Sequence, residues 1–124
     1  MARNLLLMAA ASGLLLVILG AFGAHALEAR LPAQHMLWWQ KAVHYQGMHT
    51  LALLGCGLLA LHHPSRNLRV AGGLFFAGML LFSGSLYLLA LTGQRGLAIA
   101  TPLGGTAFIA GWFCLGLAAW RLPR

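Results

Sequence analysis

The sequence predicts an all-α fold, a four-helix transmembrane bundle formed by a single integral membrane domain over residues 1–124. Two observations lead to this prediction. The chain is 60% hydrophobic and only 7% charged, whereas soluble domains carry roughly 25% charged residues. Its apolar residues also gather into four runs, and a membrane-spanning helix needs about 20 residues. A soluble chain this short could not cover so much apolar surface, so lipid is the expected solvent.

The predicted spans share long apolar stretches with few charges, and they cover residues 5–27, 45–61, 68–91 and 102–120. We expect each of them to be helical, because an open sheet in lipid would leave backbone groups without hydrogen-bond partners. Pro64 should end the second helix, and Ser65 should cap the third. Thr101 is the expected N-cap of the fourth helix, with Pro102 at its first helical position.

The first apolar run also has features of a signal peptide. Arg3 gives it a positive start, and Ala24-His25-Ala26 fits an A-x-A cleavage site. The run is, however, longer than the 7–15 residues of a usual signal core. We therefore expect a retained first helix.

An amphipathic segment over residues 32–44 should precede the second span. Pro32 can open a helix, and the residues after it are polar on one side and apolar on the other. Such a segment suits the membrane interface, and Gly47 could bend the chain where the span begins. Tryptophan is enriched at membrane interfaces, so we expect interface anchors at Trp38, Trp39 and Trp120.

The basic residues decide the predicted orientation. They are scattered singly, although the net charge is +7, and nucleic-acid binding needs a clustered basic face. One side of a four-span chain would hold Arg3, Arg66, Arg69, Arg121 and Arg124. The other side would hold Arg30, Lys41 and Arg95, partly offset by Glu28. The positive-inside rule then places both termini in the cytoplasm.

Small residues four positions apart allow helix backbones to approach closely in lipid. Three such pairs occur in the predicted spans: Gly20 with Ala24, Gly73 with Ala77, and Ala107 with Gly111. They predict helix packing within the bundle or between subunits. Cys56 and Cys114 lie inside apolar runs without ligand spacing, which is typical of packed thiols.

Polar residues inside the spans are costly unless they are paired. Counted at about 1.5 Å per residue, those of all four predicted helices fall at the same outer level, where Thr101 and Thr106 open the fourth. The predicted cluster consists of His25, Tyr45, Gln46, His49, Ser83, Ser85 and Tyr87. One hypothesis is a closed hydrogen-bond network that holds the helices together. The alternative is an open pocket that binds or passes a ligand.

A metal or haem site and a catalytic site have less support in the sequence. His25 and His49 could bind haem or a transition metal, but no local ligand spacing accompanies them. Glu28 is the only carboxylate, and we expect it to pair with a basic side chain or water. No convincing catalytic set is present. We therefore expect no enzyme activity, no cofactor and no metal.

Several motifs resemble those of the transmembrane-protein-256-like family, also called domain of unknown function 423. They are GAFGAHAL (20–27), YQGMH (45–49), FSGSLYLLALTG (82–93), TPLGG (101–105) and GW (111–112). The resemblance covers nearly the whole chain and implies a small four-span membrane protein found in bacteria and, in related form, in eukaryotes; we expect this one in the bacterial inner membrane. It implies recurrent polar positions at the seven residues of the predicted cluster, and it implies no activity, substrate or cofactor.

The sequence thus favours a non-enzymatic structural or interaction protein in the lipid bilayer. Its partners could be a second copy or another membrane protein. The alternative is a binding or transport module for a lipid head group or small polar solute. A haem or metal carrier is a third hypothesis.

Overall fold

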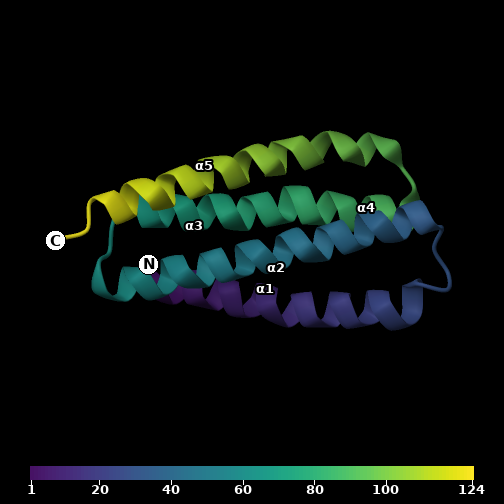
Figure 1. Cartoon of the computed structure of the whole chain (residues 1–124), viewed down its shortest axis with the longest axis horizontal. Coiled ribbons are helices and arrows are strands. Elements are labelled where there is room, and N and C mark those ends of the chain that lie inside the picture. The colour runs from purple at the N-terminus through teal and green to yellow at the C-terminus, as the bar shows by residue number, and fades with distance from the viewer.

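The computed structural model describes residues 1–124 as four long helical rods packed side by side, each antiparallel to the next along the chain (Figure 1). The first rod is α1 (Ala2–Phe22) continued by the π turn η1 (Gly23–Leu27), and the second is α2 (Ala33–His62). The third joins α3 (Arg66–Gly78), the π turn η2 (Met79–Ser83) and α4 (Gly84–Thr92). The fourth joins the 3-10 helix η3 (Arg95–Ile99) and α5 (Ala100–Trp120).

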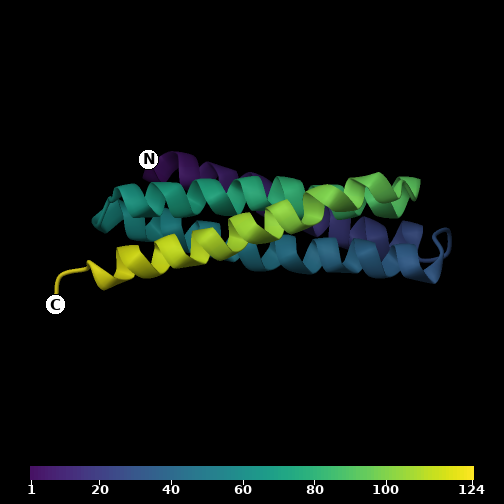
Figure 2. The same ribbon diagram turned by 90° about the horizontal axis from the view of Figure 1, so that it is seen from above.

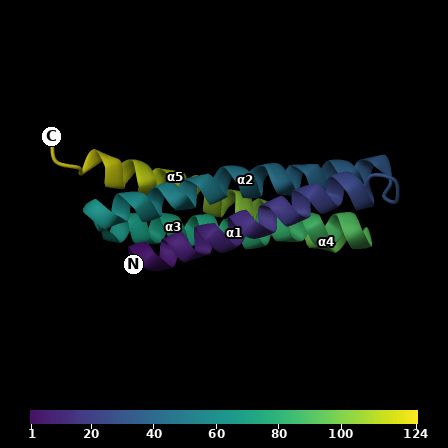
Figure 3. The same ribbon diagram turned by 90° about the horizontal axis from the view of Figure 1, so that it is seen from below.

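The arrangement places both termini at one end of the bundle, with the turn between α2 and α3 (Figure 1). The opposite end, called the far end below, holds the α1–α2 and α4–α5 connections. Helix α1 packs along α2, and α5 packs along α3. Figure 2 shows α5 crossing the long axis at a slant, and Figure 3 shows the same for α1.

Three rods are long and apolar enough to cross a membrane: Ala2–Leu27, Arg66–Thr92 and Arg95–Trp120. They contain the first, third and fourth predicted spans and extend each of them by a few residues. The predicted second span, residues 45–61, forms the latter half of α2. Polar side chains early in that half lower its mean hydropathy, so length and composition identify three spanning helices.

The predicted amphipathic segment, residues 32–44, leads directly into the predicted second span, as expected. Helix α2 runs unbroken from Ala33 to His62, without a break at Gly47. The ring Nδ1 of His35 lies 2.8 Å from the carbonyl oxygen of Ala90, at hydrogen-bond distance. The buried face of this segment also packs on α4, so it belongs to the bundle along its whole length.

The three predicted interface anchors differ in their surroundings. Trp39 is only 3% exposed, and its indole N–H donates to the carbonyl of Leu19 over 3.0 Å. The prediction of an anchor is wrong for Trp39, because it is a packing residue between the first and second rods. Trp38 is half-buried, with its ring 4.8 Å from that of His35. Trp120 is 85% exposed and is the one available to an interface.

The predicted caps have different outcomes. The Ser65 hydroxyl accepts a 3.2 Å hydrogen bond from the Leu68 N–H, so Ser65 caps α3 as expected. Thr101 lies inside α5 and does not cap it. Its hydroxyl lies 2.6 Å from that of Ser85. The residues before it already form a 3-10 helix, which extends the rod toward the far end.

The closest helix approach lies between α5 and η2. A Cβ atom added to Gly104 would collide with the backbone of Phe82. One added to Gly111 would meet the Phe75 ring at 2.7 Å, so Gly111 packs as predicted. Gly73 is exposed with open space around it, so its predicted packing role is wrong within one chain.

The other predicted small residues pack more loosely. A Cβ atom on Gly20 would lie 3.6 Å from the Val43 side chain, an ordinary contact with α2. Ala24 is exposed, and Ala77 and Ala107 are half-buried. Cys56 is fully buried in the main core, and the half-buried Cys114 packs against that core. Both thiols are packing groups, as the sequence predicted.

Candidate functional site

Gln46 is the centre of a hydrogen-bond network that joins three rods. Its Oε1 accepts from the hydroxyl of Tyr87 over 2.6 Å. Its Nε2 donates to the carbonyl oxygen of Ser12 at 3.2 Å and lies 3.3 Å from the Ser12 hydroxyl. The buried Gln46 carboxamide therefore links α1, α2 and α4.

The network continues through Ser12 to the middle of the third rod. The hydroxyls of Ser12 and Thr50 lie 2.7 Å apart. Both also contact the sulfur of Met79, at 3.5 and 3.6 Å. We call these five residues the central polar network: Ser12, Gln46, Thr50, Met79 and Tyr87.

His49 lies on the other side of α2 and makes a separate set of contacts. Its Nδ1 lies 2.8 Å from the carbonyl oxygen of Tyr45, and the Trp112 indole N–H donates to its Nε2 over 3.1 Å. Because the indole can only donate, Nε2 is the acceptor and the proton belongs to Nδ1. The ring also stacks on Phe108, with centroids 3.5 Å apart and planes at 7°.

The two predicted serines bind backbone carbonyls. Ser83, in η2, donates to the carbonyl oxygen of Ala42 over 2.8 Å and so ties the third rod to α2. Ser85 donates to the carbonyl of Phe82 over 2.9 Å and also contacts Thr101. The π turn at η2 shifts the helix face at this point, and such turns are frequent at functional sites.

The side chains of two predicted cluster residues, His25 and Tyr45, form none of these hydrogen bonds. His25 lies in η1, is exposed, and forms no hydrogen bond to the rest. Its inclusion was wrong because depth along a helix says nothing about the face on which a residue lies. Tyr45 is half-buried, and its ring packs 4.5 Å from that of Phe82. Its hydroxyl, however, has no hydrogen-bond partner.

The sequence reasoning missed three members of these contacts. Ser12 is the only polar side chain between residues 5 and 19, and Thr50 directly follows His49. A lone hydroxyl in an apolar run is the feature that could have indicated Ser12. Trp112 is the third, and it hydrogen-bonds His49 across 63 residues of chain.

All buried side-chain nitrogen and oxygen atoms have hydrogen-bond partners. The buried part of the predicted cluster is thus fully paired. No group of three His, Cys, Asp or Glu residues lies close enough to hold a metal ion. Both ring nitrogens of His49 are engaged and His25 is exposed, so this arrangement does not support a haem or metal site between them.

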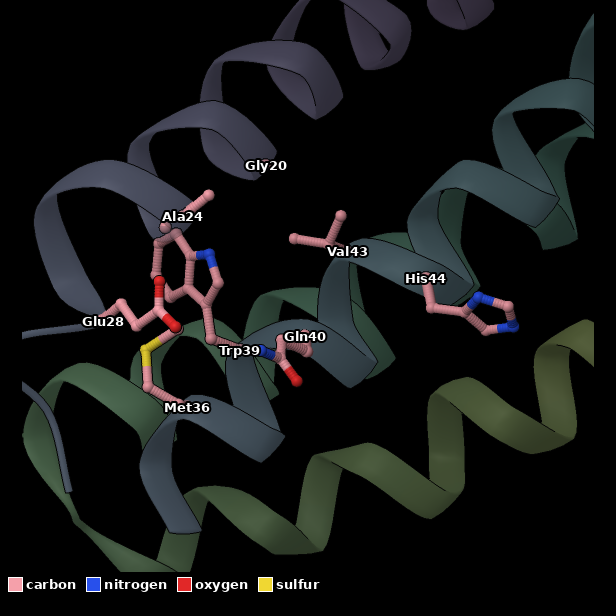
Figure 4. A pocket seen from close by; sticks show the side chains of 9 residues that line it. Gly20, Ala24, Glu28, Met36, Trp39, Gln40, Val43 and His44 are labelled. Carbon is pink, nitrogen blue, oxygen red and sulfur yellow. The ribbon is translucent and has the colours of Figure 1, made fainter. Parts of the chain in front are cut away.

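Several openings lie at the surface of the bundle, and two of them bear on function. A groove of 500 Å³ lies between α2 and α5, and Tyr45, Phe108 and Trp112 are among the residues that line it. A second pocket, of 330 Å³, lies toward the far end, between the end of the first rod and the first half of α2 (Figure 4). It includes Glu28, the only acidic residue.

Three spanning helices packed in one bundle, with buried polar groups paired between rods, define a small helical membrane protein. The family described as "Protein of unknown function (DUF423)" matches residues 19–105 of the chain. The chain therefore belongs to this family, which confirms the predicted resemblance to domain of unknown function 423.

Curated relatives match over most of their length. A UPF0382 membrane protein of Staphylococcus haemolyticus is 51% identical over 96 residues, which cover 77% of this chain and 78% of the relative. The UPF0382 inner membrane protein YgdD of Escherichia coli (strain K12) is 43% identical over 122 residues, or 98% and 93% of the two chains. No solved structure matches.

Proposed function

We propose that this protein is a non-enzymatic structural or interaction protein that crosses the bacterial inner membrane four times. The observation that carries the proposal is the complete pairing of buried polar side-chain atoms between the rods. In lipid, burial of apolar surface does not drive helices together, so packing and interhelical hydrogen bonds must hold the bundle. The Escherichia coli relative is named an inner membrane protein, which supports this location.

A non-enzymatic role fits the way the reactive side chains are used. The Ser83 hydroxyl is donated to a carbonyl oxygen, and both ring nitrogens of His49 are engaged. Neither group is free to act as a nucleophile or base. The test of the structural role is the stability of variants of the central polar network, since a binding role would not require these variants to unfold more easily.

The fourth span of this proposal is the latter half of α2. Its exposed residues include Leu51, Leu54 and Leu58, which suit contact with lipid. It also lies beside three spanning helices in the same bundle (Figure 1). The first half of α2 carries exposed polar residues, and we propose that it reaches the interfacial region.

Both termini should lie in the cytoplasm, because the terminal end of the bundle carries five of the eight basic residues. Fusion of alkaline phosphatase to Arg124 should give an inactive enzyme, while fusion of green fluorescent protein should fluoresce. The same reporters placed after Gly93 should give the opposite pair of results. Phosphatase activity at Arg124 would reverse the proposed orientation.

A second candidate function is ligand binding in the groove between α2 and α5. The observation that favours it is Tyr45, which lines this groove and whose hydroxyl has no hydrogen-bond partner in the chain. An unpaired hydroxyl in an apolar setting costs free energy, and a lipid or small polar solute with an acceptor oxygen would offset that cost.

We expect Tyr45→Phe to lose a small molecule that the wild type retains in native mass spectra from mild detergent. The variant keeps the aromatic packing on Phe82 and removes only the hydroxyl. Thr92→Val, at an exposed hydroxyl already bound to the Leu88 carbonyl, is the control and should keep the wild-type spectrum. Identical spectra for wild type and Tyr45→Phe would argue against a ligand at this hydroxyl.

A further inference from the structure

The pocket toward the far end differs from the central polar network in its chemistry. Its volume is 330 Å³, and its lining includes Gly20, Ala24, Glu28, Trp39, Gln40 and His44. The small residues of the first rod leave the space open, and the side chains of α2 form the opposite wall. Figure 4 shows Glu28 reaching toward Trp39 and Met36, with Gln40 and His44 further along α2.

Glu28 is the only acidic side chain in a chain of net charge +7. We expected it to pair with a basic side chain or with water, and its exposed carboxylate forms no ion pair or hydrogen bond with another residue of the chain. A carboxylate accepts hydrogen bonds through two oxygens and attracts a cation. This unpaired carboxylate, at the edge of a pocket, therefore makes one end of it suited to a positively charged group.

The exposed side chains of α2 indicate the depth in the membrane at which the pocket lies. Its first half exposes Gln40, Lys41 and His44, whereas its latter half exposes leucines such as Leu51 and Leu58. Side chains of the first kind belong with lipid head groups and water, and those of the second kind belong with acyl chains. The pocket thus opens where the head groups of surrounding lipids would be found.

We propose that this pocket binds the primary ammonium group of a zwitterionic phosphoethanolamine head group, with Glu28 as its counter-charge. The ammonium donates to the Glu28 carboxylate, and such charge-assisted bonds are about twice as strong as neutral ones. Gln40, which also lines the pocket, offers the N–H groups of its amide to the adjoining phosphate. A metal ion fits less well, because no three metal-ligating side chains come together.

This site is independent of the structural role proposed above. Glu28 takes no part in the central polar network and is exposed. Glu28→Gln should therefore leave the thermal unfolding of the bundle unchanged, while a variant of the network should unfold more easily and still bind the head group once folded. The two proposals can fail separately.

The test is native mass spectrometry of the purified protein in nanodiscs or detergent with equimolar phosphatidylethanolamine, phosphatidylcholine and phosphatidylglycerol. We expect the wild type to retain phosphatidylethanolamine preferentially. Glu28→Gln, which keeps the size of the side chain and removes its charge, should lower that retention roughly tenfold. Ala24→Leu, which fills the pocket without a charge change, should lower it to a similar extent.

His62→Gln, an exposed substitution at the other end of the bundle, is the matched control and should behave as the wild type. A phosphoethanolamine group can belong to a lipid or to a soluble molecule, and addition of millimolar O-phosphoethanolamine distinguishes the two. Displacement of the lipid by that compound would assign a soluble phosphoethanolamine ligand, and no displacement would assign the lipid head group. Equal retention by the wild type, Glu28→Gln and Ala24→Leu would overturn the proposal.

Discussion

Gln46→Leu should lower the free energy of unfolding of the bundle by about 2 kcal/mol. Leucine is close to glutamine in size, so the change removes hydrogen bonds with little loss of volume. It leaves the Tyr87 hydroxyl, which donates to Gln46 over 2.6 Å, without its partner in a half-buried site. An unsatisfied buried hydroxyl costs about 1–3 kcal/mol.

Unfolding of the variant in mixed detergent, followed by circular dichroism, measures this effect. Gln34→Leu on the exposed face of the same helix is the control and should be close to neutral. The double variant Gln46→Leu/Tyr87→Phe should recover part of the loss, because it removes both partners of the bond. A single variant as stable as the wild type would contradict the structural role of the network.

Gly104→Ala should destabilise the bundle by about 1–3 kcal/mol, a typical cost of overpacking a well-packed core. The new Cβ atom would collide with the backbone of Phe82, which cannot rotate away as a side chain could. The α5 helix and η2 would therefore have to separate. That separation would also weaken the contact between Phe82 and Phe108, whose ring centroids are 5.5 Å apart.

Gly73→Ala is the matched control for this change. It lies in an equally regular helix, but nothing is within 4 Å of the added atom. Alanine favours a helix over glycine by roughly 0.5–1 kcal/mol, so this variant should be neutral or slightly more stable. The measurement is the thermal unfolding temperature of both variants in the same detergent. Equal unfolding temperatures would show that α5 does not pack as closely as described.

The contrast between these two glycines shows the limit of pattern reasoning. The spacing of Gly73 with Ala77 matched the expected packing motif, yet Gly73 is exposed. Gly104 formed no part of a predicted pair and makes the closest backbone approach of α5. Spacing shows which residues share a helix face, but it does not show which face meets another helix.

The predicted polar cluster also shows that the sequence identifies residues but not their contacts. Gln46, His49, Ser83, Ser85 and Tyr87 belong to the predicted cluster and all form hydrogen bonds, since a polar side chain in an apolar run is costly without a partner. Their partners could not be read from the sequence. Ser12 is 34 residues from Gln46, and Trp112 is 63 residues from His49.

The sequence by itself determined the class of this protein and the approximate extent of its helices. Composition and run length control those properties, because lipid excludes unpaired backbone groups whatever the tertiary arrangement. The tertiary structure alone decided that Trp39 is buried, that His25 faces outward and that Glu28 borders a pocket without a partner. These outcomes depend on how each rod is rotated against its neighbours, including the shift in helix face at the π turn η2, and no local pattern in the sequence specifies that rotation.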